Sequence, residues 1–403
     1  MSLVEIDQAY ALIEQACPKL PEAALELAQA LNRVTAAPLT SQCDLPPFDQ
    51  SAMDGYALNA ADTTRLPARL PLAQTIAAGP HDSVPVLKAG HACRIYTGGI
   101  IPNGANAVVR QEWVQRDDAH VVIDRNISVG HDLRRQGEEL SKGAHLIDPG
   151  RRLNAGHLAM LGMAGVATVK VHRAPRIRVL VSGDEVIEAG RPLRPGEVYN
   201  ANGPLISAWL QRSGYSDVSV EALADDERAV SHSLDRAFSE SDLVLTSGGV
   251  SVGDRDLIAP EAEKLGARRI LWKVAQKPGK PLYVAQKDQC LLMGLPGNPG
   301  SVLVNLASFV RRALDTMETQ AEPGPAIRMG VLRGSVKPDA ARECWVRVRT
   351  EIDANGVMGL HPQTGQASHM LSNLARADAI VRVPRGDTVL SAGSLLPWLS
   401  LGL

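Results

Sequence analysis

Residues 243–256 read LVLTSGGVSVGDRD, a short apolar run followed by a glycine-rich loop and two aspartates. Two other stretches begin in the same way, RVLVSGDE at 178–185 and CLLMGLPGNPGS at 290–301. Apolar runs of this length are typical of strands that are buried on both faces of a parallel sheet. In open α/β sheets the loops after such strands meet at one edge, where ligands bind.

Helical patterns lie between and after these runs. Residues 204–212 carry a proline in the first turn, and 301–317 place apolar residues on one face, with Asn298 and Pro299 at the start. The repetition of strand, loop and helix predicts a doubly wound α/β domain over residues 175–320.

The rest of the chain differs in composition and in the spacing of its apolar residues, so the expected fold class is multi-domain α/β. Residues 46–143 are rich in Gly, Pro and short β-branched runs, which predicts a small, mostly β domain. We expect it to be inserted into a helical linker domain formed by residues 1–45 and 144–174. The helical period is lost after the α/β domain, so residues 321–403 are expected to form a small C-terminal β-barrel.

Local patterns give more detailed expectations. Apolar residues at helical spacing predict helices over 3–17, 21–34 and 155–161. Short β-branched runs predict strands over 84–87 and 107–109 in the inserted domain.

The composition excludes several classes of protein. With 45% apolar and 21% charged residues the whole chain of 403 residues can fold, and a net charge of −2 argues against a nucleic-acid binder. The five cysteines form no CxxC pair, which indicates a reducing compartment rather than a disulfide framework. The chain has neither a signal-peptide pattern nor an apolar run of about 18 residues, so we expect a cytoplasmic protein without a membrane span.

The three strand-end loops are suited to a phosphate. Glycines allow close approach of the backbone and turn N–H groups toward a ligand, and a helix start at Pro299 adds further donors. The alternative is ordinary tight turns, which three such loops on successive strands make less attractive. The substrate-binding residues expected in and around these loops are Ser182, Gly248, Gly249, Ser251, Gly253, Pro296, Gly297, Asn298 and Pro299.

Carboxylates follow the same loops and indicate a divalent cation. Mg²⁺ in proteins is typically held by one or two carboxylates together with phosphate oxygens. The acidic residues are Asp184, Glu185, Asp225, Asp226, Asp254 and Asp256. Glu185, Asp254 and Asp256 are the expected metal ligands, and Asp184, Asp225 and Asp226 are expected to bind substrate. For Asp225 and Asp226 the alternative is that they cap a helix starting near Glu227.

A lysine-rich segment precedes the last apolar run. Lys277, Lys280 and Pro281 belong to a KPGKP turn, and Lys273 lies four residues before it. A stiff turn that carries two cations can hold a compact oxyanion. The alternative is a solvated hairpin tip.

The motifs of the inserted and C-terminal domains carry no chemistry that follows from physical rules alone. SAMDGYA contains Asp54, RIYTGG contains Thr97, GEEL contains Glu139, and ASH contains Ser368 and His369. Ordinary turn structure explains each of them equally well. His369 by itself is more typical of a hydrogen-bonded surface or core histidine than of a ligand.

Taken together, these motifs resemble the MoeA family, which includes the E domains of gephyrin and of plant cofactor-insertion proteins. SAMDGYA, RIYTGG, GEEL, SGDE, TSGGVSVGD, KPGKP, GLPGNP and ASH occur in the family's order and at its approximate spacing. TSGGVSVGD and GLPGNP would also fit the smaller MogA-type domain, which adenylates the pterin. SAMDGYA and the C-terminal domain distinguish the two families.

The resemblance implies a four-part, elongated subunit with a MogA-like α/β domain, and a homodimer. The active site would lie between the α/β domain of one subunit and the inserted β domain of the other. The implied substrates are adenylated molybdopterin and molybdate; molybdenum enters the dithiolene and AMP leaves, with Mg²⁺ or Zn²⁺ required. A MogA-type adenylyltransferase and molybdoenzyme acceptors are the implied protein partners.

The family's functional residues correspond to residues already discussed. By resemblance the catalytic set is Asp54, Thr97, Glu139, Glu185 and Asp256, and substrate binding extends to Lys273, Lys277, Lys280, Arg347 and Ser368. Glu139 stands where many relatives have Asp. Two alternative functions compete with the transferase: a scaffold protein that uses the same fold, and a molybdopterin adenylyltransferase.

Overall fold

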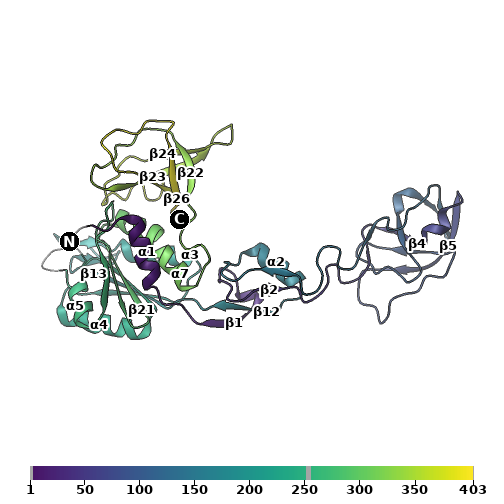
Figure 1. The fold of residues 1–403 in the computed structure, drawn as a ribbon, viewed down its shortest axis with the longest axis horizontal. Helices are drawn as coiled ribbons and strands as arrows, with labels where there is room; N and C mark the ends of the chain where they lie inside the picture. The colour runs from purple at the N-terminus through teal and green to yellow at the C-terminus, as the bar shows by residue number, and fades with distance from the viewer. Residues whose placement is uncertain (1–2, 251–255, 403) are drawn as a thin grey trace.

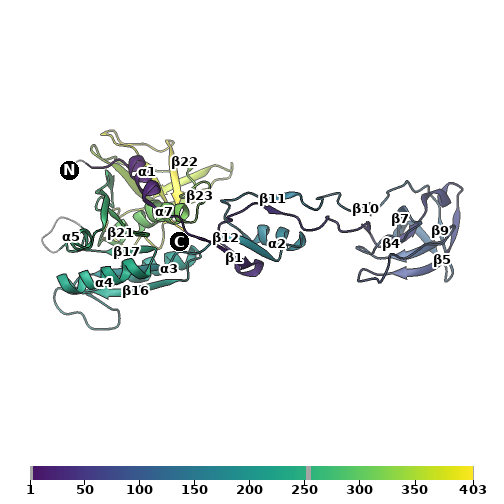
Figure 2. The same cartoon turned by 60° about the horizontal axis from the view of Figure 1, so that its bottom comes forward.

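A computed structural model describes residues 3–250 and 256–402. The molecule is elongated (Figure 1). The α/β domain and the C-terminal β domain lie together at one end, a narrow linker lies in the middle, and the inserted β domain lies at the other end. The same three-part arrangement is seen after rotation about the long axis (Figure 2). None of the helices in these residues combines the length and apolar character that a membrane span requires.

The α/β domain is built on a six-stranded sheet. The strand order is β16 (Val218–Leu223), β13 (Ile177–Ser182), β17 (Leu243–Ser247), β21 (Cys290–Leu295), β20 (Tyr283–Lys287) and β18 (Arg268–Trp272). The first four strands are parallel and the last two pair antiparallel. Apolar clusters fill both faces of the sheet, as the uninterrupted apolar runs predict.

Helices cover both faces of this sheet. They are α3 (Asn202–Arg212), α4 (Glu227–Glu240), α5 (Ile258–Lys264), α6 (Pro299–Asn305) and α7 (Arg311–Met317), with a π-helical turn at Leu306–Val310 between the last two. Asn298 and Pro299 start α6 as expected. The doubly wound α/β prediction is confirmed.

The N-terminal helix α1 (Ile6–Ala16) corrects the expected domain boundary. Its buried face joins the core of the α/β domain, and the Tyr10 hydroxyl lies 2.5 Å from the Ser308 hydroxyl. The first residues therefore belong to the α/β domain and not to the linker domain of 1–45. The helix itself was predicted correctly; its apolar spacing says that it is buried but not against which surface.

The linker domain is more β-rich than expected. Its strands β1 (Glu22–Glu26) and β12 (Thr168–His172) pair antiparallel, as do β2 (Leu39–Thr40) and β11 (His145–Ile147). The helix predicted over 21–34 is wrong, because this segment forms β1 and a short 3₁₀ turn at Leu27–Gln29. Pairing with β12 overrides the helix propensity of its Ala, Leu and Glu residues. The helix predicted over 155–161 is confirmed as α2 (Ala155–Met163), which Asn154 caps.

The inserted domain is a small β structure. Its main sheet has the order β7 (Ala107–Arg110), β4 (Gly55–Leu58), β6 (Ala92–Ile95), β5 (Ala68–Ile76), β9 (His120–Ile123) and β8 (Val114–Arg116). The strand predicted over 107–109 is confirmed. The strand predicted over 84–87 is wrong: Val86 forms only an isolated bridge with Asn103 and is 73% exposed, so no neighbouring strand extends the pairing.

The C-terminal domain is a small closed β-barrel. Its strands are β22 (Arg328–Leu332), β23 (Glu343–Ile352), β24 (Met358–Pro362), β25 (Ala379–Val383) and β26 (Leu395–Ser400). Pairing of β23 with both β24 and β25 closes the barrel. The short strand β19 (Gln276–Lys277) of the α/β domain pairs with β23, so the two domains share a sheet.

Candidate functional site

A cavity of about 780 Å³ lies at the edge where β13, β17 and β21 end. All three strand-end loops contribute to its wall, as the sequence predicts. Of the expected site residues, it is lined by Ser182, Glu185, Asp225, Gly248, Gly249, Asp256, Pro281, Pro296, Gly297, Asn298 and Pro299. Ser251, Gly253 and Asp254 lie outside the described residues.

The glycines of the second loop pack too tightly to carry side chains. Gly248 and Gly249 have φ of 90° and 66°, and a Cβ on Gly248 would lie 2.8 Å from the Ser182 hydroxyl. Glycine tolerates this left-handed conformation at little cost. Backbone at these positions therefore forms the cavity wall itself, as a phosphate cradle requires.

Asn202, at the first position of α3, ties two of the loops together. Its Nδ2 donates to the Ser247 hydroxyl and to the Gly297 carbonyl, both at 2.7 Å. The sequence does not single out Asn202, because its two partners lie far from it in the chain. Tyr199, His369 and Leu371 also line the cavity and were not assigned, although His369 was considered.

The carboxylates divide into two groups. Glu185, Asp225 and Asp256 line the cavity, whereas the Asp226 side chain accepts from the Ala229 N–H at 2.9 Å and caps α4. The capping alternative therefore holds for Asp226, which corrects its assignment to substrate binding. Asp184 also lies outside the cavity wall, and its Oδ1 accepts from the Asp225 N–H at 3.1 Å.

The described residues contain no group of three His, Cys, Asp or Glu side chains close enough to enclose a metal. Glu185 and Asp256, which both line the cavity, are two oxygen donors. This number is typical of a Mg²⁺ ion that takes its other ligands from phosphate and water. The donor set thus fits a metal that is shared with a phosphorylated ligand.

The three lysines are not among the residues that line the cavity. Lys277 Nζ forms an ion pair with Asp339 of the barrel at 3.1 Å, and Lys273 Nζ lies 5.0 Å from the centre of the Trp272 ring. Lys280 is exposed and directly precedes Pro281, which lines the cavity. Because β19 pairs with β23, the KPGKP turn is anchored between two domains and is not a free hairpin tip.

Arg347 acts on a loop of the cavity wall. It is 1% exposed, and its guanidinium donates to the carbonyls of Gly365, Ala367 and Met370 at 2.9, 3.0 and 3.3 Å. Burial lowers the pKa of this group. Ser368, in the same loop, accepts from Asn298 Nδ2 at 3.0 Å. Neither residue lines the cavity, so Arg347 holds the loop that brings His369 to its edge.

Gly300→Ala is expected to disturb this loop and to lower the free energy of unfolding by about 1–3 kcal/mol, the usual effect of overpacking. An added Cβ would lie 2.5 Å from Arg347 Nη1 and 2.8 Å from the Ser368 carbonyl oxygen. Urea denaturation measures the change. Gly386→Ala is the control, because its Cβ would meet only Pro338 at 4.0 Å. Equal stability of both variants would contradict the packing described here.

A second group of expected catalytic residues lies in the inserted domain. Asp54 Oδ1 accepts from both the N–H and the hydroxyl of Thr97, at 2.8 Å each, and these bonds lower the pKa of Asp54. No hydrogen bond from the described residues reaches Asp54 Oδ2 in this structure. Glu139 is exposed at the base of the domain.

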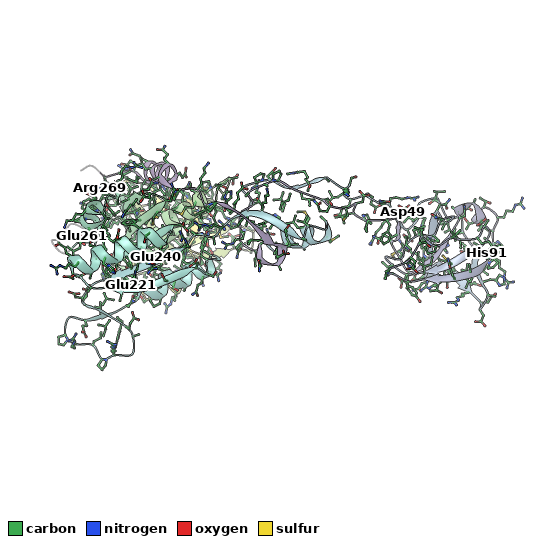
Figure 3. The ribbon with its side chains drawn as sticks, turned by 90° about the horizontal axis from the view of Figure 1, so that it is seen from below. Asp49, His91, Glu221, Glu240, Glu261 and Arg269 are labelled. Carbon is green, nitrogen blue, oxygen red and sulfur yellow. The ribbon has the colours of Figure 1, made fainter. Side chains whose placement is uncertain are left out.

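These residues are remote from the cavity in the same chain. Figure 3 shows Asp49 and His91 of the inserted domain at one end of the molecule, and Glu221, Glu240 and Glu261 of the α/β domain at the other. One chain therefore carries two separated halves of the site that the motifs predict.

Comparisons with known proteins cover the whole chain. Family models match at residues 4–165 (MoeA N-terminal region, domain I and II), 178–316 (probable molybdopterin binding domain) and 329–401 (MoeA C-terminal region, domain IV). A molybdopterin molybdenumtransferase of Nostoc sp. is 31% identical over 92% of this chain and 86% of its own length. One of Haemophilus influenzae is 30% identical over 97% of both chains.

A solved structure agrees with these matches. The crystal structure of the molybdopterin biosynthesis MoeA protein from Pyrococcus horikosii is similar, with a TM-score of 0.81 and 26% identity, over 99% of both chains.

Proposed function

Because the chain belongs to the MoeA family of molybdopterin molybdenumtransferases, we propose that it transfers molybdenum from molybdate to adenylated molybdopterin and releases AMP. The observation that carries this proposal is the cavity at the ends of β13, β17 and β21, where backbone-lined loops and carboxylates meet. Such an arrangement binds a phosphorylated ligand together with a cation.

The residues of the cavity wall receive distinct roles. Backbone N–H groups around Gly248, Gly249 and the start of α6 hold the phosphates, and Ser182 and Asn202 keep the loops in place. Glu185 and Asp256 hold Mg²⁺ or Zn²⁺, which when bound would offset the charge of the phosphoanhydride. Lys273, Lys277 and Lys280 attract molybdate beside the cavity, at the boundary with the barrel.

The active form is a homodimer in which two chains complete each site. Asp54, Thr97 and Glu139 of one subunit meet the cavity of the other, because the inserted domain and the α/β domain of one chain lie at opposite ends of the molecule (Figure 1). Asp54 suits this role, because the Thr97 bonds hold Oδ1 and lower the pKa of the carboxyl group, which favours its ionised form. We further propose a cytoplasmic protein that receives its substrate from a MogA-type adenylyltransferase and delivers its product to molybdoenzymes.

Mixing two inactive variants is expected to restore activity if the site is shared. Asp54→Ala and Asp256→Ala damage different halves, so a mixed dimer has one intact site and one doubly damaged site. Random exchange of subunits makes about half of the dimers mixed, and one of the two sites in each mixed dimer is intact. The mixture should therefore show about a quarter of the wild-type activity. Molybdenum insertion after subunit exchange measures the recovery, with each variant alone as the control. No recovery from freely exchanging subunits would contradict the shared site.

Reconstitution of an apo-molybdoenzyme tests the reaction itself. The purified chain, adenylated molybdopterin, molybdate and Mg²⁺ should yield active enzyme and AMP in equal amounts. A scaffold protein would release no AMP. An adenylyltransferase would instead form adenylated pterin from molybdopterin and ATP.

A further inference from the structure

The joint between the linker domain and the α/β domain is polar. The linker has its own apolar core, which contains Leu39, Leu153 and Leu161 and is separate from the core of the α/β domain. No apolar cluster of the described residues is continuous across the joint. The relative direction of the two domains is therefore fixed by something other than hydrophobic packing.

Arginines of the linker cross the joint and meet buried carboxylates of the α/β domain. Arg152 Nη2 lies 2.7 Å from Asp315 Oδ1 and 2.8 Å from Glu318 Oε2, and Arg33 Nη1 lies 3.5 Å from Glu318 Oε1. Glu318 is fully buried and Asp315 is 1% exposed. The Tyr215 hydroxyl donates to Glu318 at 2.6 Å, and burial raises the pKa of this tyrosine, which keeps it a donor.

The chain passes between the α/β domain and the linker domain twice, and hydrogen bonds hold both of these crossings. The first crossing, near Leu20, is held by a hydrogen bond between its carbonyl and the His172 ring at 2.8 Å. At the second crossing the Arg173 guanidinium makes two bonds to Asp242, at 2.6 and 2.7 Å. Directional bonds therefore surround the joint.

Charged contacts of this kind restrict the relative orientation of the two domains. A buried charge that loses its partner costs several kcal/mol. Rotation of the linker would leave Asp315 its pair with Arg311 of α7, but it would take both arginine partners, Arg33 and Arg152, away from Glu318. A single orientation therefore satisfies Glu318. Buried ion pairs of this kind add little to the net free energy of unfolding. Their effect here is to fix the direction of the linker domain relative to the α/β domain.

We propose that Arg152 and Glu318 are positioning residues that aim the arm, defined as residues 22–172, at the cavity of the partner subunit. The inference rests on the proposed shared site. Figures 1 and 2 show the inserted domain at the far end of this arm, so a small rotation at the joint displaces Asp54 and Thr97 by a much larger distance. Misplacement of a reacting group by about 1 Å can lower a rate about a hundredfold.

Glu318→Gln and Arg152→Lys test this role in the full-length dimer. Glu318→Gln removes one negative charge with little change of shape. Arg152→Lys keeps the positive charge but loses the planar guanidinium group that contacts two carboxylates. The control is Arg382→Lys. Arg382 pairs with Asp7 and Glu343 between α1 and the barrel, and its side chain is 19% exposed against 20% for Arg152. Three quantities are measured: kcat for insertion, the Kd of AMP, and small-angle X-ray scattering.

Both joint variants should lower kcat about tenfold to a hundredfold, keep the Kd of AMP within about twofold, and broaden the distance distribution from scattering. Arg382→Lys should change none of these. The proposal is overturned if the scattering curves of the joint variants match the wild type, or if kcat is unchanged while only thermal stability falls. Should the wild type show no insertion, the proposed function fails. Scattering alone then decides whether the joint sets the direction of the arm.

Discussion

Asp256→Ala is expected to abolish the release of AMP while leaving the fold intact. The residue lines the cavity just before α5, after the loop that contains Gly248 and Gly249. In the proposed reaction its carboxylate helps to hold the cation that offsets charge on the phosphoanhydride. Loss of one such electrostatic group costs about a hundredfold to a thousandfold in rate, and loss of the cation with it costs more.

AMP release from adenylated molybdopterin, followed by chromatography, measures this effect beside a thermal melt. Asp235→Ala is the matched control, because Asp235 lies on the exposed side of the same domain and pairs with Lys287. Normal cleavage by the Asp256 variant with an unchanged melting temperature would remove this residue from the site.

Lys280→Ala should raise the molybdate concentration needed for half-maximal insertion by about one to two orders of magnitude. Attraction between one lysine and a dianion at about 4 Å is several kcal/mol near a protein surface, before desolvation is subtracted. The Gln276 side chain holds the turn, since its Nε2 donates to the Gly279 carbonyl at 2.8 Å, and Gly279 has a φ of 92°. The backbone that carries Lys280 is therefore ordered before the anion arrives, which lowers the entropic cost of binding.

Lys277→Ala should have the smaller effect, because Asp339 already offsets part of the Lys277 charge at 3.1 Å. Lys264→Ala is the control, a cation of α5 in the same domain that pairs with Glu227 of α4 and with Glu261 of its own helix. Affinity for adenylated pterin should change little in all three variants. If molybdate dependence stays constant and pterin binding collapses, these lysines serve the pterin and not the oxyanion.

The part of the site that sequence predicts well is local. A buried parallel strand and the loop that follows it are neighbours in the chain, so the cavity wall formed by Gly248, Pro296 and Glu185 could be located from pattern alone. The four-part organisation is also visible in changes of composition and of apolar spacing along the chain. In both cases the signal and its structural consequence occupy the same stretch of residues.

Long-range partners could not be predicted in this way. The segment 21–34 has the residues of a helix, yet β1 is selected by pairing with β12, more than a hundred residues later. Asn202 finds Ser247 and Gly297 only after the sheet forms, and Arg347 reaches the loop of Ser368 only when the barrel closes. The residues around Asp54 do not by themselves indicate that it lies far from the cavity of its own chain; only the resemblance to the MoeA family implies a site shared between subunits.

The placement of α1 has a consequence for folding during synthesis. This helix leaves the ribosome before the rest of the α/β domain, but the core that buries Ile6 and Ile13 includes Phe309 and Val310, near the end of that domain. The whole arm is made in between and can fold on its own apolar clusters. The α/β core cannot close until α7 has emerged and the waiting N-terminal helix docks. Contacts of such high sequence separation slow folding, and an unpaired apolar helix is exposed to misassembly meanwhile.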